Sequence, residues 1–137
     1  MEYKKIMKTK HTGFTLIELM VVILIIAILA SVTIPMMRGR IDRSKWTEAN
    51  AAAGAIRSAA KLYFVETGNT VTGNLTNASV QQALNMQNAD LTGAYFVPSD
   101  YQIDSVSANG IVVVTVTGSQ SNAPSGSKTL ALDGSWE

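Results

Sequence analysis

Residues 13–35 read GFTLIELMVVILIIAILASVTIP, and this stretch decides the fold. Residues 14–34 are 21 consecutive residues with a single formal charge, Glu18. At about 1.5 Å of rise per helical residue they span ~31 Å, close to the thickness of a bilayer's hydrocarbon core. The stretch therefore predicts a membrane-spanning helix. The carboxylate inside it indicates a function, because an ionised group in lipid is costly.

A short basic segment precedes the apolar run. Residues 1–13, MEYKKIMKTKHTG, hold four lysines and end in Gly13. A basic segment before an apolar run is typical of a secretory signal peptide. Here, however, the charged segment meets the apolar run at Gly13, and no A-x-A cleavage site follows the run. An ordinary signal peptide therefore does not fit.

The hexapeptide GFTLIE at residues 13–18 resembles the processing and assembly motif of type IV pilins and of the pseudopilins of type II secretion. The resemblance covers residues 8–35: glycine, phenylalanine, a glutamate at the fifth position of the processed chain, an apolar helix, and Pro35. It implies cleavage between Gly13 and Phe14 by a prepilin peptidase and N-methylation of Phe14. It also implies extraction of the subunit from the membrane into a helical filament. The alternative is a plain single-pass anchor in which Glu18 is tolerated.

We expect three segments along the chain: a basic leader that is cleaved (residues 1–13), the membrane and assembly half of a long helix (residues 14–35), and an amphipathic helix half with a globular β head (residues 36–137). Pro35 should kink or loosen the helix rather than end it, because the helical pattern resumes directly after it. We expect the helix to cover residues 14–67, with Gly68 as its C-cap. The positions expected to face the head are Met37, Ile41, Ala49, Ala52, Ile56, Ala59 or Ala60, and Tyr63.

The head should be a small antiparallel meander packed on the amphipathic half of the helix, which makes the fold class α+β. Residues 68–79 have the composition of a surface loop. Two glycosylation sequons lie there, at residues 74–76 and 77–79, and an ordinary Asn/Thr-rich loop is the simpler interpretation. Ser79 could cap a helix over residues 80–86.

Strand patterns follow in the last third of the chain. Tyr101, Ile103 and Ser105 alternate with polar neighbours, which predicts a first strand. Asn109-Gly110 predicts a hairpin turn between it and a second strand at residues 111–117, and residues 128–132 predict a third strand. Asp133-Gly134 should form a turn, and Trp136 should fold back onto the sheet.

Composition limits the function further. The chain has no cysteine, which excludes disulfides and thiolate chemistry; many type IV pilins close their C-terminal region with a disulfide, and this chain departs from that pattern. Without residues 1–13 it holds 7 basic and 9 acidic residues, a net charge of −2. Residues 68–137 contain one basic residue, Lys128, and five acids. Their net charge of −4 opposes the phosphate-driven binding of nucleic acid.

No catalytic constellation can be built from these residues. The single histidine, His11, lies in the leader, and the sequence has no Walker loop or glycine-rich dinucleotide motif. We therefore expect a non-enzymatic protein without a cofactor. Loop carboxylates can hold calcium, but none of these acids forms a recognisable calcium loop; the weak candidates are Asp90, Asp100, Asp104 and Asp133.

Three functions remain open from the sequence. The favoured one is a pilin that is held in the inner membrane by a single span and then assembled into an extracellular pilus. The others are a periplasmic type II secretion pseudopilin and a competence-type DNA-uptake pilin. The expected partners are other copies of the chain, the prepilin peptidase, the inner-membrane assembly platform, and membrane lipid before assembly.

Overall fold

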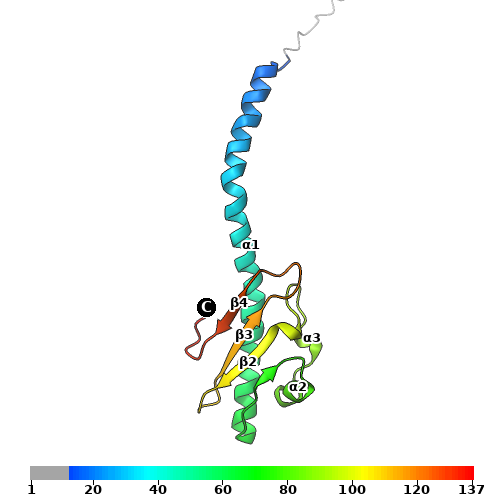
Figure 1. The fold of residues 1–137 in the computed structure, drawn as a ribbon, viewed down its shortest axis with the longest axis vertical. Coiled ribbons are helices and arrows are strands. Elements are labelled where there is room, and N and C mark those ends of the chain that lie inside the picture. Colours follow the sequence, from blue (N-terminus) through cyan, green and yellow to red (C-terminus); the bar gives the residue numbers. More distant parts are fainter. Residues whose placement is uncertain (1–12) are drawn as a thin grey trace, which may run out of the picture. The chain divides into compact units, whose positions relative to one another are not determined.

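The computed structural model describes residues 13–137 and divides between Arg38 and Gly39 into two compact units. The expected leader therefore lies outside the described residues, apart from Gly13. One helix, α1 (Leu16–Thr67), contributes residues to both units, and Figure 1 shows the fold.

Helix α1 is uninterrupted over 52 residues and contains Pro35 in its interior. This confirms that the helix does not end at the proline. Thr67 is its last residue, as predicted, and Gly68 follows with φ +70 and donates its N–H to the carbonyl of Phe64 at 2.8 Å. The predicted glycine C-cap is thus confirmed. The helix begins two residues later than expected, because Thr15 caps it.

The second unit contains an antiparallel sheet in the order β1-β2-β3-β4 (Figure 1). Its strands are β1 (Gly73–Asn74), β2 (Tyr101–Val106), β3 (Val112–Thr117) and β4 (Ser127–Leu130). The predicted hairpin joins β2 to β3, with Gly110 at φ +73 donating its N–H to the carbonyl of Ser107. The meander and the α+β fold class are confirmed.

The last strand is shifted from its predicted range. β4 ends at Leu130 because Ala131 enters the turn around Gly134, donating its N–H to the carbonyl of Ser135 at 2.9 Å. After that turn Trp136 returns to pair with Leu130 in an isolated antiparallel bridge. The turn at residues 133–134 and the return of Trp136 onto the sheet are both as predicted.

Short elements between α1 and β2 are where sequence-based expectations fail. The helix expected at residues 80–86 is α2 (Ala78–Leu84), capped by Asn77 rather than by Ser79. Asn77 Oδ1 accepts the N–H of Ser79 at 3.1 Å, so Ser79 donates to the cap instead of forming it. β1, α3 (Asn88–Leu91) and the 3-10 helix η1 (Pro98–Asp100) were not predicted.

The core lies between the sheet and one stripe of α1. Ala49, Ile56 and Ala60 are buried as predicted, and Trp46 and Ala53 join them. Ala49 and Ala53 have no exposed surface. The full buried set of α1 is Trp46, Ala49, Ala53, Ile56 and Ala60.

The expectation that Met37 and Ile41 face the head is wrong. Met37 is 60% exposed and Ile41 is 47% exposed. Their periodicity continues that of the buried stripe, but the first buried residue of α1 is Trp46. Trp46 packs against Phe96 with ring centroids 5.2 Å apart and against Trp136 at 6.1 Å. The aromatic cluster thus marks the point from which the head buries one stripe of α1.

Two charged residues on α1 flank the buried stripe and hold backbone groups of the head. The carboxylate of Glu48 accepts the N–H groups of Ala94, Tyr95 and Phe96 at 3.0–3.1 Å. The guanidinium of Arg57 donates from Nε to the carbonyl of Val112 at 3.1 Å.

Arg57 also reaches the C-terminal strand. Its Nη2 donates to the carbonyl of Leu130 at 2.8 Å and also to that of Ala131. Burial lowers the pKa of Arg57, and the nearby carboxylate of Asp133 opposes that shift. In a chain without cysteine, these polar contacts fasten β3 and β4 to the helix.

Candidate functional site at the start of the apolar helix

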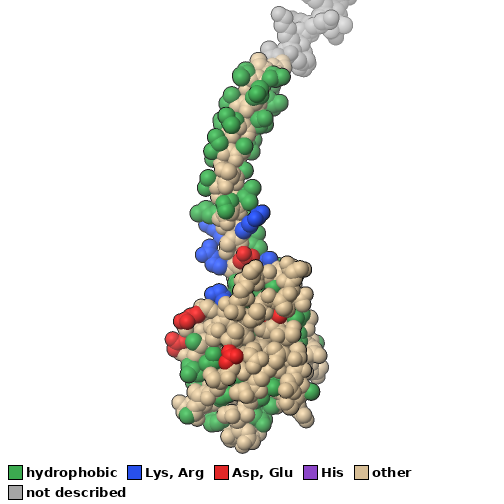
Figure 2. All heavy atoms as spheres, viewed as in Figure 1, with side chains coloured by type: hydrophobic (Ala, Val, Ile, Leu, Met, Phe, Trp, Pro, Cys, Tyr) green, Lys and Arg blue, Asp and Glu red, His purple; other side chains and the backbone are tan. Residues whose placement is uncertain are grey.

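The first part of α1 exposes its apolar side chains in every direction. Exposed fractions run from 47% at Val22 to 77% at Leu16, and Phe14, just before the helix, is 85% exposed. Figure 2 shows these hydrophobic side chains along the helix on the face that is drawn. A continuous apolar surface of this length needs lipid or other protein to cover it.

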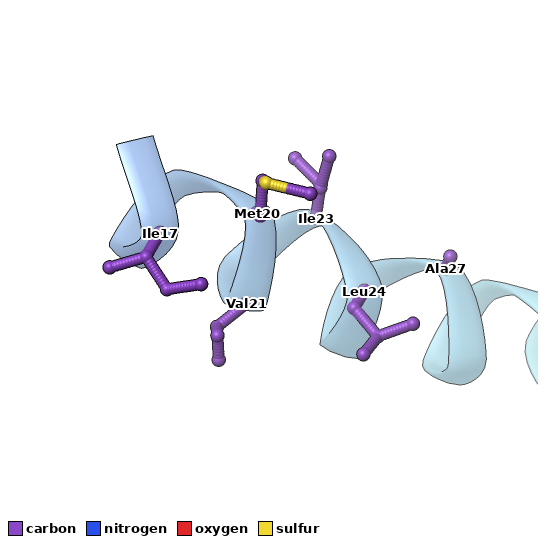
Figure 3. Close-up of a pocket in the computed structure, with 6 residues that line it drawn as sticks. All are labelled: Ile17, Met20, Val21, Ile23, Leu24 and Ala27. Atoms are coloured by element: carbon purple, nitrogen blue, oxygen red, sulfur yellow. The ribbon is translucent and has the colours of Figure 1, made fainter. Parts of the chain in front are cut away.

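The same segment passes the length and composition test for a membrane span. Its mean hydropathy over 18 residues is 2.9, and none of that window is buried within the subunit. Figure 3 shows the surface that Ile17, Met20, Val21, Ile23, Leu24 and Ala27 line on consecutive turns. These side chains bear no hydrogen-bonding nitrogen or oxygen, so this surface suits lipid or another apolar helix.

Glu18 and Thr15 form a reciprocal cap at the start of α1. The Thr15 N–H and hydroxyl each donate to Glu18 Oε2 at 2.9 Å. The Glu18 N–H points back to Thr15 Oγ1 at 3.3 Å. This is the capping box that the sequence T-x-x-E favours, and it satisfies backbone donors that a helix start leaves unpaired.

The role of Thr15 in this site was not predicted, although the Thr15–Glu18 spacing is a recognised signal for it. Both contacts use Oε2, and no hydrogen bond to Oε1 comes from residues 13–137. Glu18 therefore stabilises the start of its own helix through one carboxylate oxygen.

Phe14 and Glu18 share one surface at the N-terminal end of the helix, together with Ile17, Val21 and Val22. In the full chain the nitrogen of Phe14 is a peptide amide, and only cleavage before it creates a charged amine. A Cβ added at Gly13 would meet nothing within 4 Å. Packing against the described residues 14–137 therefore does not require glycine at that position.

Each of the four weak calcium candidates accepts a hydrogen bond at a separate place in the second unit. Asp90 accepts the N–H of Gln87 at 2.7 Å, and Asp100 accepts that of Val97 at 2.9 Å. Asp133 accepts the N–H of Ser135 at 2.9 Å, which lowers the pKa of its carboxyl. The remaining candidate, Asp104, accepts the Thr115 hydroxyl. Within residues 13–137 no three metal-ligating side chains gather in one place.

The sequons have local structural roles. Asn74 Oδ1 accepts the N–H of Thr76 at 2.9 Å, and its side-chain N–H donates to the carbonyl of Ser99 at 3.0 Å. Asn77 is the cap of α2. Both contacts agree with the ordinary-loop interpretation.

Comparison with known proteins identifies the family. The model of the prokaryotic N-terminal methylation motif matches residues 8–34. A fimbrial protein of Neisseria meningitidis serogroup A is 35% identical over 92% of this chain and 67% of its own length. The fimbrial protein EcpC of Eikenella corrodens is 32% identical over 96% of this chain and 84% of its own length.

The chain belongs to the type IV pilin and pseudopilin family. The type II secretion system core protein G of Pseudomonas aeruginosa is also similar, with 36% identity, but over 56% of this chain and 49% of that protein. The fimbrial relatives therefore match along nearly the whole pilin-like chain, whereas the secretion protein matches about half of it.

Proposed function

We propose that this pilin-like chain is the structural, non-enzymatic subunit of a type IV pilus. One observation carries the proposal: fimbrial proteins match it over 92–96% of its length. The exposed apolar half of α1 supports the same function, because a filament of such helices would cover it. Before assembly the same surface would lie in the inner membrane as a single span, and after assembly in an extracellular fibre.

Processing would precede assembly. A prepilin peptidase would cleave between Gly13 and Phe14, and the new amine of Phe14 would be methylated. The family model, which is described as a methylation motif, covers both residues. The space around Gly13 is open, which supports the idea that glycine is required there by the peptidase rather than by the fold.

Glu18 would then act in assembly. Cleavage places a positive charge on Phe14, and the helix cap leaves Glu18 Oε1 free of bonds from residues 13–137. In lipid both charges are costly, and an ion pair lowers the penalty of each. A pair between Glu18 of one copy and Phe14 of the next would set the axial register of an added subunit. The assembly platform would supply the site of addition.

Replacing Glu18 separates assembly from insertion. Glu18→Val should leave the subunit expressed and in the membrane, because an apolar residue favours insertion. Surface filament yield, relative to membrane-bound subunit, should fall strongly when the variant is the sole copy. Thr15→Val serves as the control, because it removes the hydroxyl of the cap and keeps the carboxylate. Normal filament yield from Glu18→Val would remove the assembly role.

A pseudopilin of type II secretion is the second candidate, supported by the similarity to core protein G. A DNA-uptake pilin has weaker support: Arg38, Arg40 and Arg43 are exposed, but residues 68–137 carry a net charge of −4. Electron microscopy of sheared surface material distinguishes the first two candidates, because a secretion pseudopilus stays in the periplasm.

A further inference from the structure

We propose that the second unit carries both halves of a head-to-tail contact between copies, with Glu66 of one subunit entering a basic, aromatic pocket of a copy farther along the filament than the one whose Phe14 meets Glu18. The inference rests on the proposed filament function and names one contact within that filament. Both halves lie within residues 39–137, on opposite ends of the same part of α1.

The receiving half is a cavity of about 230 Å³ beside the first buried turn of α1. Two tryptophans form its apolar wall, and two cations and two small polar side chains complete it. The salt bridge found among residues 13–137 joins Lys45 to Asp42, so the pocket's own two cations have no carboxylate partner there. The pocket therefore suits a ligand with one carboxylate and an adjoining apolar surface. Its lining residues are Arg43, Trp46, Thr47, Asn50, Lys128 and Trp136.

The inserting half lies in the last turn of the same helix. Glu66 is exposed, and residues 13–137 supply no ion pair to it. A carboxylate is unfavourable there, because a helix carries partial negative charge at its C-terminal end and this last turn contains no basic residue. Beside it, Leu62 is 58% exposed and Val65 is 67% exposed. An acid and two apolar side chains thus share one surface that the subunit leaves uncovered.

The two halves cannot meet within one subunit. Arg43 and Glu66 are 23 residues apart on one helix, which separates them by ~35 Å at about 1.5 Å per residue. Figure 1 shows this part of α1 running along the whole sheet, from one end of the second unit to the other. Their complementarity can therefore be used only between copies.

A contact of this kind is heterologous, because different surfaces of the same chain meet. Such contacts repeat without closing when the rotation between copies does not form a ring, and the result is a filament. Leu62 and Val65 would cover the tryptophan wall while Glu66 pairs with Arg43 and Lys128. Removing water from the pair strengthens it, since its charges then interact through a lower dielectric.

Charge exchange tests the contact in cells that carry the chain as sole copy. Arg43→Glu and Glu66→Arg should each lower surface filament yield by about tenfold, as expected when one partner of a desolvated charge pair is lost. The double variant restores opposite charges and should return most of the yield. Arg40→Glu is the matched control, because Arg40 is also exposed but does not line the pocket. It should leave the yield close to that of the parent.

A second measurement uses the absence of cysteine from the chain. Asn50→Cys with Val65→Cys places one thiol in the pocket and one beside Glu66. Mild oxidation of sheared filaments should give a ladder of linked subunits, whereas each single variant should stay monomeric. Normal yield from both charge variants, or oxidised filaments of the paired variant without a ladder, would overturn the contact. If the filaments sheared from the parent strain do not contain this chain, the proposed function is overturned instead.

Discussion

Glu48 shows how a charged residue beside a buried helix stripe can organise a loop. The helical pattern places it off the apolar stripe, yet its carboxylate accepts three successive backbone N–H groups, those of residues 94–96. Asp100 accepts the next one, from Val97. Two carboxylates therefore satisfy four consecutive donors in a segment without regular structure. A side chain at Gly93 would collide with Glu48 Oε1 and displace the carboxylate from these hydrogen bonds.

Glu48→Ala should destabilise the second unit. It leaves three backbone donors without partners, and half-buried donors of this kind cost about 2–4 kcal/mol together. Urea unfolding of a fragment that begins at Arg38 measures the change. Glu66→Ala is the control on the same helix; Glu66 has no ion pair within residues 13–137, so its replacement should change stability by less than about 0.5 kcal/mol. Equal stability of the two variants would show that the Glu48 contacts contribute nothing.

Tyr101 predicts an alkaline limit to the stability of the same unit. Burial raises the pKa of Tyr101, and the carboxylates of Glu48 and Asp100 raise it further. The unfolded chain therefore loses this proton at a lower pH than the folded chain does, so the free energy of unfolding falls as the pH rises above about 10. Tyr101→Phe should flatten this fall in urea titrations between pH 9 and 11. An unchanged slope would contradict the assignment.

Gly110 joins the β2–β3 hairpin to the end of α1. Its φ of +73 suits glycine, and an added Cβ would lie 2.4 Å from Cδ1 of Phe64. Gly110→Ala should cost about 3 kcal/mol or more, because backbone strain of about 1–2 kcal/mol adds to this collision. Gly68→Ala has nearly the same φ, +70, and open space around the new Cβ, so it measures the strain alone. Similar thermal denaturation of the two variants would show that Phe64 simply moves aside.

At the scale of elements, the apolar periodicity predicted the bounds of α1 closely, but it predicted less well which of its residues the head buries. The helix was expected over residues 14–67 and is found at Leu16–Thr67. Met37 and Ile41 repeat the spacing of the buried residues, but periodicity does not tell where the covering sheet begins. Trp46 marks that point, and its packing against Phe96 and Trp136 depends on residues far apart in the sequence.

The two shortest helices, α3 and η1, were not predicted, for a different reason. α3 and η1 have four and three residues, too few for a periodic pattern. They are held by side-chain caps from Asp90 and Asp100, residues whose loop positions indicated only solvent or weak metal binding. The hairpin at Asn109-Gly110 was predictable because turn chemistry is local. At the candidate site, the order of Gly13, Phe14 and Glu18 was evident from sequence, whereas the cap from Thr15 was missed.

The division of the chain predicts an independently folding part. A fragment that begins at Arg38 keeps the buried stripe of α1 and all four strands. It should be soluble, with the circular dichroism of mixed helix and strand. Because the chain has no cysteine, reducing agent should leave its melting temperature unchanged. Aggregation under several conditions would show that the head needs the apolar half of the helix.

For the whole molecule, the distribution of surface chemistry explains why a subunit of this kind assembles. The apolar half of α1 offers area without specificity, since Leu, Ile and Val side chains cover it all round. In our two proposals, specific register comes from charges: Glu18 at the start of the helix and Glu66 at its end. The C-terminal region is closed without a disulfide, through Arg57 and the backbone pairing of Thr129 with Glu137 at 2.8 and 3.1 Å.

The most direct test of the account is the intact mass of this chain in purified, sheared surface filaments. We predict a chain of residues 14–137 that carries one methyl group on the amine of Phe14. In our proposal, this cleavage creates the charged amine of Phe14 with which Glu18 of another copy pairs. A chain in the filaments that retains residues 1–13, or filaments from which this chain is absent, would contradict the account.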